Sequence, residues 1–433
     1  MNPEEKNTAR SALNIAVIGS GISGIATAWL LSEKHRVHLF EKNDYIGGHT
    51  HTHAMDDHGQ TVNVDTGFIV FNRPNYPHLT GMLKHFNLPT QPTEMSFGVS
   101  LDQGRLEYGG NNLATLFAQK TNLLRPGFLR MVQDILRFNR EGKAALQDAS
   151  FTNAESLNDF LDRHRFGEGM RDDYLLPMAA AIWSCPTEIM LKFPARSFLQ
   201  FFENHGLMNV NERPQWETIC GGSRRYIEAI AAENRFTIHA NKAIDHVRRT
   251  ENGVYLADVD EHFDACVFAG HADQTLASLT DADPQEHKIL SAFKFQENQA
   301  YLHHDISLMP KRRAVWSSWN YLGQKNESSG RAVAVTYWMN HLQRLQTDTD
   351  WLVTLNPFAP PKPELTRKKI TYHHPVFDDK TAVAQQELSS IQGHRHCYYA
   401  GAWTGYGFHE DGLRSAVNVA AAFGITPPWQ TST

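Results

Sequence analysis

The sequence has little cysteine and no paired cysteine motif. Its 433 residues include four cysteines, Cys185, Cys220, Cys266 and Cys397, and no two of them form a CxxC pair. This spacing excludes a dense disulfide framework, and sparse cysteines are typical of a reducing compartment. We therefore expect a cytoplasmic protein.

The chain also lacks an excess of positive charge. The formal net charge is -6 and the isoelectric point is about 6.4, so the chain has no overall field that would attract a polyanion. We expect no nucleic-acid partner. The 41% of hydrophobic residues and 20% of charged residues are ordinary for a globular protein, and a chain of this length is expected to form two domains.

Long apolar runs are missing. The first fourteen residues lack the apolar segment of a secretory signal, and the run around Leu175 to Trp183 is interrupted by Pro177 and too short to cross a bilayer. We expect neither a signal peptide nor a transmembrane helix. The segment from Leu124 to Arg140 mixes apolar residues with arginines, as a basic amphipathic helix does. Such a helix either rests on an anionic membrane, which would place the protein peripherally on the inner membrane, or packs on the core with its charged face in solvent.

The glycines near the N-terminus follow an ordered pattern. The apolar run from Asn14 to Ile18 predicts a buried strand, and it leads into Gly19-Ser-Gly21-Ile-Ser-Gly24. A helical segment to Leu31, a second strand from Arg36 to Phe40 and then Glu41 complete the pattern. This order is typical of a dinucleotide-binding βαβ unit, so we predict an α/β protein with a doubly wound, Rossmann-like domain.

Each residue type in this unit has a physical role. Gly19 allows a tight turn, Gly21 lets the backbone approach a pyrophosphate, and Gly24 lets the helix pack against the strand. Glu41 stands where an acid accepts hydrogen bonds from ribose hydroxyls. An acid there disfavours a 2′-phosphate and therefore NADP, which leaves FAD or NAD.

A second glycine pair favours FAD. Gly47-Gly48-His49-Thr50 follows Glu41, and the run from Val17 to Thr50 resembles the extended fingerprint of flavoproteins related to amine oxidases and phytoene desaturases. The resemblance implies an FAD cofactor in a glutathione-reductase-type domain, hydride transfer from a C–H bond to flavin N5, and contact of the second glycine pair with the pyrophosphate. The family usually has Arg or Lys where this chain has His49, which would compensate a phosphate charge only when protonated.

Three alternating histidines raise the question of a metal. His49, His51 and His53 would lie on one face of an extended segment and could in principle bind zinc. No carboxylate or cysteine stands at a matching interval, so we expect no metal site. We expect His49 near phosphate and the other two as ordinary strand histidines.

The resemblance extends along the chain. Val62 to Phe68 resembles the segment that passes the flavin ring, and Gly221-Gly222 resembles the pair that leads a helix back into the cofactor domain. Ile244 corresponds to the adenine contact, within a strand expected from Asn241 to Val247.

The C-terminal segment resembles the family's closing motif. A strand from His396 to Gly401 precedes a glycine-rich stretch and a helix expected from Leu413 to Phe423, whose N-terminus would point at the flavin N1/C2 edge. A helix N-terminus stabilises negative charge there by about 0.3–2 kcal/mol. We expect Asp411 to be the N-cap of this helix.

The candidate site residues follow from these matches. Those assigned to the cofactor are Gly19, Ser20, Gly21, Ser23, Gly24, Glu41, Lys42, Gly48, His49, Thr66, Gly67, Phe68, Ile244, Ala269, Gly401, Ala402, Asp411, Gly412 and Leu413. The catalytic candidates are His409, Glu410 and Tyr406.

The cofactor segments are separated in sequence. We predict a discontinuous FAD-binding domain of residues 10–80, 205–275 and 390–424, and a mixed α+β substrate domain of residues 81–204 and 276–389. Helices are expected in the first insertion at Leu113–Gln119, Phe128–Ala145, Glu155–His164 and Asp172–Trp183, and strands in the second at Gln299–His303 and Arg331–Tyr337.

The resemblance leaves the substrate open. Amine oxidases place an aromatic wall near the position of His409 and a lysine near flavin N5, where pattern alignment puts Gln299, with Lys294 nearby. These differences disfavour an amine, and a histidine beside flavin suits proton transfer during desaturation or isomerisation. Nearly the whole chain resembles a bacterial subgroup associated with fatty-acyl lipid modification. Our hypothesis is an FAD-dependent oxidoreductase acting on a hydrophobic substrate, a fatty-acyl chain. The alternatives are a flavin amine oxidase and a non-catalytic flavin-binding lipid carrier.

Overall fold

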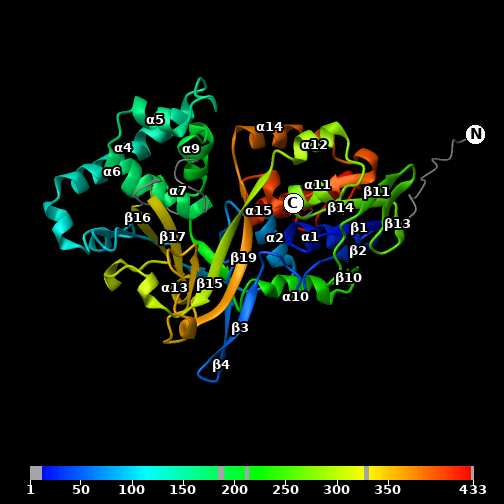
Figure 1. Cartoon of the computed structure of the whole chain (residues 1–433), viewed down its shortest axis with the longest axis horizontal. Helices are drawn as coiled ribbons and strands as arrows, with labels where there is room; N and C mark the ends of the chain where they lie inside the picture. Colours follow the sequence, from blue (N-terminus) through cyan, green and yellow to red (C-terminus); the bar gives the residue numbers. More distant parts are fainter. Residues whose placement is uncertain (1–11, 184–189, 210–213, 326–330, 431–433) are drawn as a thin grey trace, which may run out of the picture. The chain divides into compact units, whose positions relative to one another are not determined.

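The structure is a computed structural model that describes residues 12–183, 190–209, 214–325 and 331–430 (Figure 1). The chain divides into two compact units. Unit 1 comprises Met1–Gly48, Tyr226–Ala292 and Ala384–Thr433, and unit 2 comprises His49–Arg225 and Phe293–Val383. Residues 49–80 and 205–225, which we assigned to the FAD-binding domain, pack within unit 2. Which residues make up the FAD-binding domain and which the substrate domain stays a prediction.

Unit 1 is built on a parallel sheet. Its five strands have the order β10-β2-β1-β14-β20, and every neighbouring pair is parallel. The strands are β10 (Thr237–His239), β2 (Arg36–Phe40), β1 (Asn14–Ile18), β14 (Ala265–Phe268) and β20 (Cys397–Tyr399). The strand order changes direction at β1, and ligands of doubly wound sheets bind at such a switch point. The predicted fold class is confirmed.

The first strand and helix are buried as their sequence predicts. Ile15, Ala16 and Val17 are fully buried in β1, because a central parallel strand is covered on both faces. All residues of α1 (Ile22–Leu31) are buried, and α15 (His409–Ala422) packs against α1.

The rest of unit 1 surrounds this sheet. A three-stranded antiparallel sheet contains β11 (Val247–Thr250), β12 (Gly253–Leu256) and β13 (Glu261–Phe263). The strand expected from Asn241 is wrong, because Asn241 has a positive φ of 55° and pairing begins only at Val247. The further helices that lie wholly or partly in unit 1 are α10 (Arg224–Ala232), α11 (Ala272–Ser278), α12 (Pro284–Leu290) and α14 (Asp379–Glu387).

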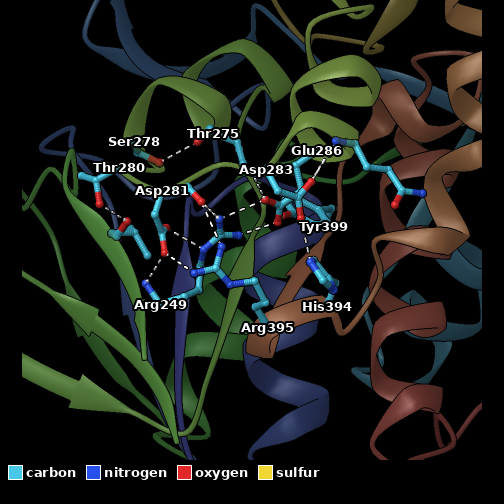
Figure 2. A network of polar contacts seen from close by, with 12 residues as sticks. Arg249, Thr275, Ser278, Thr280, Asp281, Asp283, Glu286, His394, Arg395 and Tyr399 are labelled. Carbon is cyan, nitrogen blue, oxygen red and sulfur yellow. Dashed lines mark hydrogen bonds and ion pairs between the residues drawn. The ribbon is translucent and has the colours of Figure 1, made fainter. Parts of the chain in front are cut away.

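A buried ion network holds unit 1 together (Figure 2). The Arg249 side chain, on β11, is fully buried and donates to Glu286 at 2.9 Å and to Asp281 at 2.7 Å. Tyr399, on β20, donates its hydroxyl to Glu286 at 2.9 Å, and Arg395 donates to Asp281 at 2.5 Å. The network therefore joins two strands to the loop and helix after α11.

The same network contains a group with metal-ligand spacing. Asp283, Glu286 and His394 are close enough to share a cation. However, Glu286 is already paired with Arg249, and Asp283 caps α12 through the amides of Gln285 and Glu286. These bonds give the acids a structural role.

Unit 2 contains a seven-stranded sheet of order β19-β15-β18-β17-β16-β7-β8. Neighbours are antiparallel except β16 and β7, which are parallel. The strands are β19 (Thr366–Val376), β15 (Lys294–His303), β18 (Leu352–Leu355), β17 (Arg331–Trp338), β16 (Trp319–Lys325), β7 (Phe97–Leu101) and β8 (Leu106–Gly109). The long pair β15 and β19 runs side by side in Figure 1. Both predicted strands of the second insertion are confirmed as parts of β15 and β17.

Two smaller sheets complete the strands of unit 2. One is the hairpin of β3 (Thr52–Asp57) and β4 (Gln60–Asp65), and the other has the order β5-β9-β6. The strands of the latter are β5 (Val70–Asn72), β9 (Trp216–Ile219) and β6 (Thr90–Thr93). Val62 and Val64 of β4 belong to a core cluster that also contains Met339, Trp351 and Val353.

The first insertion is mostly helical, as predicted. Its helices are α2 (Pro77–His85), α3 (Leu113–Leu116), α4 (Pro126–Gln147), α5 (Leu157–Arg163), α6 (Glu168–Met170), α7 (Leu176–Trp183) and α9 (Ala195–Asn204), and α13 (Met339–Leu342) belongs to the second insertion. Short 3₁₀ turns lie at Lys120–Leu124, Ile306–Leu308, Arg313–Val315, Pro363–Leu365, Leu388–Ser390, His394–His396 and Ala402–Thr404. No helix among the described residues combines the length and apolar character needed to cross a membrane.

Proline explains one departure from prediction. The helix expected from Asp172 to Trp183 is divided into a π-helical turn (Arg171–Leu175) and α7. Pro177 has no amide hydrogen, so it cannot donate to the carbonyl of Asp173 four residues earlier. The hydroxyl of Tyr108 donates to that carbonyl at 2.6 Å instead.

Candidate functional site

Four cofactor candidates lie at the carboxyl edge of the parallel sheet of unit 1. Gly19 follows β1, Glu41 follows β2, Ala269 follows β14, and Gly401 lies two residues beyond β20. Because the strands are parallel, these chain ends meet at one edge. The sequence pattern thus brings four segments that are distant in sequence to the same place.

The glycine turn from Gly19 to Gly24 is tightly packed, except at Gly21. A Cβ on Gly19, which has a φ of +100°, would lie 3.1 Å from the backbone of Ala269 and Gly270, and a Cβ on Gly24 would lie 1.8 Å from the Gly19 carbonyl oxygen. A Cβ on Gly21 would meet no atom within 4 Å. The start of α1 carries no side-chain cap and no acidic residue in its first turn. This combination fits a phosphate group, because the helix amides and dipole face an open space.

Glu41 connects the two glycine segments. Its buried carboxylate accepts hydrogen bonds from the amide and hydroxyl of Ser20, at 3.0 and 2.6 Å. The Ser20 hydroxyl in turn accepts the Gly47 amide at 3.2 Å. Gly48 has a φ of +58°, and a Cβ there would lie 3.1 Å from the Gly21 Cα. The second glycine pair therefore lies directly against the first turn.

The first turn of α15 packs on the first turn of α1. A Cβ on Gly412 would lie 2.7 Å from Ile22 Cγ2 and 2.9 Å from Ser23 Oγ. Ser415 Oγ lies 3.5 Å from Ser23 Oγ and accepts the Gly401 amide at 2.9 Å. Two helix N-termini thus adjoin at the carboxyl edge of the sheet, which concentrates positive partial charge there.

The prediction that Asp411 is an N-cap is wrong. The helix begins at His409, four residues earlier than expected, and its N-cap is Phe408. Asp411 reaches back from the third helical position, where its carboxylate accepts the amides of Tyr406 and Phe408 at 3.0 Å each and pairs with Arg414. Burial raises the pKa of Asp411, while these partners act in the opposite direction. The Asp411 side chain therefore holds the start of the helix through these hydrogen bonds.

The three catalytic candidates differ in their surroundings. His409 Nε2 lies 2.7 Å from the hydroxyl of Tyr226, which is fully buried on α10. Glu410 is buried, whereas Tyr406 is 43% exposed. Sequence reasoning missed Tyr226, since its position on the apolar face of an amphipathic helix carries no catalytic signal.

The other candidates of unit 1 are spread along this edge. Ile244 is buried, and the Lys242 amide, two residues before it, donates to the Glu41 carbonyl at 2.7 Å. Lys42 is exposed, with its Nζ 3.4 Å from Gln274. Leu413 is fully buried, and Ala402 opens a 3₁₀ turn after Gly401.

In unit 2, His49 is a neutral histidine. Burial, followed by the nearby His374, His51 and His373, lowers the pKa of His49 to about 3. Its Nε2 atom is buried and has no hydrogen-bond partner among the described residues. A buried donor without a partner is costly, so this atom fits a bound polar group. Charge compensation by protonated His49 is not expected at neutral pH.

The other two histidines belong to a hydrogen-bonded cluster. The Tyr372 hydroxyl lies 3.0 Å from His51 Nδ1 and 2.7 Å from Thr66 Oγ1, which lies 3.2 Å from His53 Nε2. Burial first, then neighbouring charges, lowers the pKa of His53 to about 4. Only His53 lies within β3, so the expected strand is shorter than the run of histidines.

The structure gives Gly67 a second reason to lack a side chain. A Cβ on Gly67 would lie 2.1 Å from the His49 carbonyl oxygen, which accepts the Phe68 amide at 2.8 Å. The Thr66 amide donates to the His51 carbonyl at 3.0 Å. Close packing of the two backbones thus requires glycine, and contact of Gly67 with flavin stays a prediction.

Asp65, which the sequence analysis did not select, is the centre of a buried network. Its carboxylate accepts hydrogen bonds from the Thr52 hydroxyl, from the amide and hydroxyl of Ser223 at 3.0 and 2.8 Å, and from Gln343 at 2.7 Å. In the sequence, the feature that could have identified Asp65 is its position as an acid at the end of an apolar strand. The network fixes the start of the Thr66–Phe68 segment.

We expect Asp65→Asn to change how stability depends on pH. Burial raises the pKa of Asp65 to about 6, although the hydrogen bonds oppose this. The folded chain then holds a proton that the unfolded chain releases, so stability falls as pH rises from about 4 to 6, by up to about 3 kcal/mol. Denaturant unfolding across this range should show that the Asn variant lacks this slope.

Asp57→Asn is the matched control on the same hairpin. Burial would raise the Asp57 pKa, but hydrogen bonds from Thr347, Thr349 and Trp351 lower it overall. Its contribution is therefore lost as pH falls, the opposite sign. Identical changes of slope in the two variants would contradict the assignment.

The profile of a family described as flavin containing amine oxidoreductase matches residues 22–294. The chain belongs to this family. The family is flavin-containing and its class is oxidoreductase, so the predicted FAD cofactor is confirmed.

Individual relatives are more distant. The chain is 28% identical over 295 residues to the carotenoid phi-ring synthase of Streptomyces griseus, covering 63% of this chain and 54% of that protein. It therefore spans about half the length of this curated relative. Its fold is similar to a CLA-producing fatty acid isomerase from P. acnes, with a TM-score of 0.65, 16% identity and coverage of 95% and 99% of the two chains. It is also similar to cyclohexylamine oxidase from Brevibacterium oxydans IH-35A, with a TM-score of 0.67, 15% identity and coverage of 95% and 98%. At these identities the structures indicate a shared fold alone.

Proposed function

We propose that this protein is an FAD-dependent oxidoreductase that removes a hydride from a hydrophobic substrate of the fatty-acyl class, in desaturation or a related reaction. The observation that carries the proposal is the meeting of the α1 and α15 N-termini, through Gly412 and Ser23, beside the open position at Gly21. This arrangement supports binding of an anionic dinucleotide with its redox-active end near a helix N-terminus. A cytoplasmic location, with contact to the inner membrane, is part of the proposal.

The residues of unit 1 suit the parts of FAD. We assign the pyrophosphate to the turn from Gly19 to Gly24, the ribose to Glu41 and the adenine to Ile244. The start of α15 takes the N1/C2 edge. When bound, FAD supplies the hydride acceptor, and the chain supplies orientation and electrostatics.

His409 is the proposed proton-transfer residue. Its Nε2 is held at 2.7 Å by the Tyr226 hydroxyl, and both side chains can donate or accept a hydrogen bond. Removing a hydride from a C–H bond leaves a proton on the neighbouring carbon to be taken up. A histidine held by a tyrosine suits this step, because its ordinary pKa lies near neutral pH.

The relatives and one strand support a hydrophobic substrate. The curated relative is named for a carotenoid ring and one structural neighbour for a fatty acid. On β15, Gln299 shares a strand face with Phe295 and Tyr301, whereas Lys294 is five positions away and so lies on the opposite face. Amine oxidases have a lysine where this chain has Gln299. Because Lys294 lies on the other face of β15, it cannot take the place of that lysine.

An amine substrate is the second candidate, favoured by the similarity to cyclohexylamine oxidase. Anaerobic mixing of the FAD-loaded protein with fatty-acyl lipids or with cyclohexylamine separates the two. We expect the acyl lipid to bleach the visible flavin absorbance and the amine to leave it unchanged. Bleaching by the amine alone would favour the amine oxidase, and no bleaching by any substrate would favour the lipid carrier.

His409→Gln tests the proposed residue in the same assay. We expect flavin reduction to slow by about 100-fold, since general acid–base catalysis contributes about 10²–10⁴. His58→Gln is the control, because the His58 side chain is 91% exposed. Equal rates for His409→Gln and the parent protein would remove the proton-transfer role.

A further inference from the structure

Helix α4 presents apolar side chains to solvent as well as to the core. Phe128, Met131 and Phe138 are buried, which accounts for one apolar face. Leu129 and Leu136 are 38% and 54% exposed. They are seven residues apart, so they lie two turns apart on one stripe, opposite the buried face. Packing on the core explains the buried face of α4. It does not explain the exposed stripe of Leu129 and Leu136.

The turn before α4 extends this stripe. Leu123 and Leu124 in the 3₁₀ turn Lys120–Leu124 are 52% and 85% exposed. Leu124 precedes the N-cap Arg125, and Leu129 is the fourth helical residue, positions that adjoin at a helix start. We call Leu123, Leu124, Leu129 and Leu136 the leucine patch. Exposed apolar side chains that gather on one segment in this way mark contact surfaces.

Basic side chains accompany the leucine patch. Between residues 120 and 143 the basic residues are Lys120, Arg125, Arg130, Arg137, Arg140 and Lys143, and the acidic residues are Asp134 and Glu141. The two acids are already paired, Asp134 with Arg137 at 3.0 Å and Glu141 with Arg140 at 2.9 Å. In the part of the chain that the structure describes, Lys120 and Arg130 are exposed and form no ion pair.

We propose that the leucine patch and its basic neighbours dock on the surface of an anionic lipid bilayer. The leucines enter the boundary between headgroups and acyl chains, and Lys120 and Arg130 face the lipid phosphates. The charge of this segment is complementary to such a surface, although the whole chain has a net charge of -6. Figure 1 shows α4 and its neighbours α5 and α6. This inference rests on the membrane contact of the proposed function and names the surface that makes it; adsorption itself requires no turnover.

Flotation with phosphatidylcholine vesicles, with and without phosphatidylglycerol, tests the proposal on the full FAD-loaded chain. We expect binding to the anionic vesicles only, weakened by high salt. The variant Leu124→Ser/Leu129→Ser/Leu136→Ser should bind at least about tenfold more weakly, because each leucine loses apolar area on the lipid. Lys120→Glu/Arg130→Glu should bind more weakly and lose the salt dependence.

The control is Ile306→Ser/Phe358→Ser, which removes two other exposed apolar side chains of unit 2. It should bind vesicles like the parent protein, and all variants should keep their flavin absorbance and melting temperature. Equal binding by the leucine variant, or an equal loss in the control, would overturn the proposal. A dimer of the parent protein that the leucine variant dissociates would also overturn it and assign the leucine patch to a second copy. Failure of vesicle binding leaves the flavin-reduction result unaffected, so the two proposals fail separately.

Discussion

Gly21→Ala is expected to leave the FAD-free chain within about 1 kcal/mol of its original stability while lowering FAD affinity at least tenfold. Gly21 has a φ of −58°, which alanine adopts, and its Cβ would meet no protein atom within 4 Å. The methyl group would instead occupy the open space at the start of α1, where we place the pyrophosphate. Thermal unfolding of the FAD-free protein and titration with FAD measure the two effects separately.

Gly24→Ala is the matched contrast, three residues along the same turn. Its Cβ would lie 1.8 Å from the carbonyl oxygen of Gly19. Neither backbone segment can move freely, because Gly24 is buried in α1 and the Gly19 amide donates to the Phe40 carbonyl at 2.8 Å. We expect a loss of about 3 kcal/mol or more with or without FAD. If Gly21→Ala bound FAD like the parent protein, the assignment of the pyrophosphate to this turn would be wrong.

Arg249→Met is expected to cost about 3–5 kcal/mol of unfolding free energy. The substitution leaves Glu286 buried without its countercharge, and breaking a buried pair in this way is strongly destabilising. Arg249→Met/Glu286→Leu should recover part of the loss, because no uncompensated charge then remains. Equilibrium denaturation of the FAD-free protein measures both.

The pH dependence of Glu286→Gln provides a second check. Burial would raise the pKa of Glu286, but hydrogen bonds from Arg249 and Tyr399 lower it overall. A lowered pKa contributes stability above the unfolded value of about 4.3 and loses it as pH falls, so the variant should differ most from the parent protein at neutral pH. Lys288→Met removes an exposed pair with Glu387 and should cost less than about 1 kcal/mol. If Lys288→Met lost as much unfolding free energy as Arg249→Met, burial of the Arg249–Glu286 pair would not be the cause of the large effect.

The local sequence was sufficient to predict the elements to which we assign the cofactor. Strand β1, helix α1, strand β2 and Glu41 follow from adjacent residues, because burial of a parallel strand and a glycine turn each leave a short-range pattern. The helix that closes the motif was predicted too, but with the wrong start. Asp411 folds back on the preceding amides, and spacing alone does not distinguish that geometry from an N-cap.

The side-chain contacts of the candidate site depend on residues that are far apart in sequence. Tyr226 and His409 are 183 positions apart, and Asp65 and Ser223 are 158 apart, so no local pattern connects them. The neutral state of His49 likewise depends on burial beside residues of β19.

The amino-acid sequence by itself determined that the chain forms a doubly wound, dinucleotide-binding domain of the flavin-containing family, because turns, strands and helix starts are properties of neighbouring residues. Only the tertiary structure decided which side chains are buried, paired or neutral: His409 held by Tyr226, Asp65 at the centre of its network and four leucines facing solvent. The physical reason is that hydrogen bonding and desolvation depend on what surrounds a group in space, and most of those neighbours come from elsewhere in the chain.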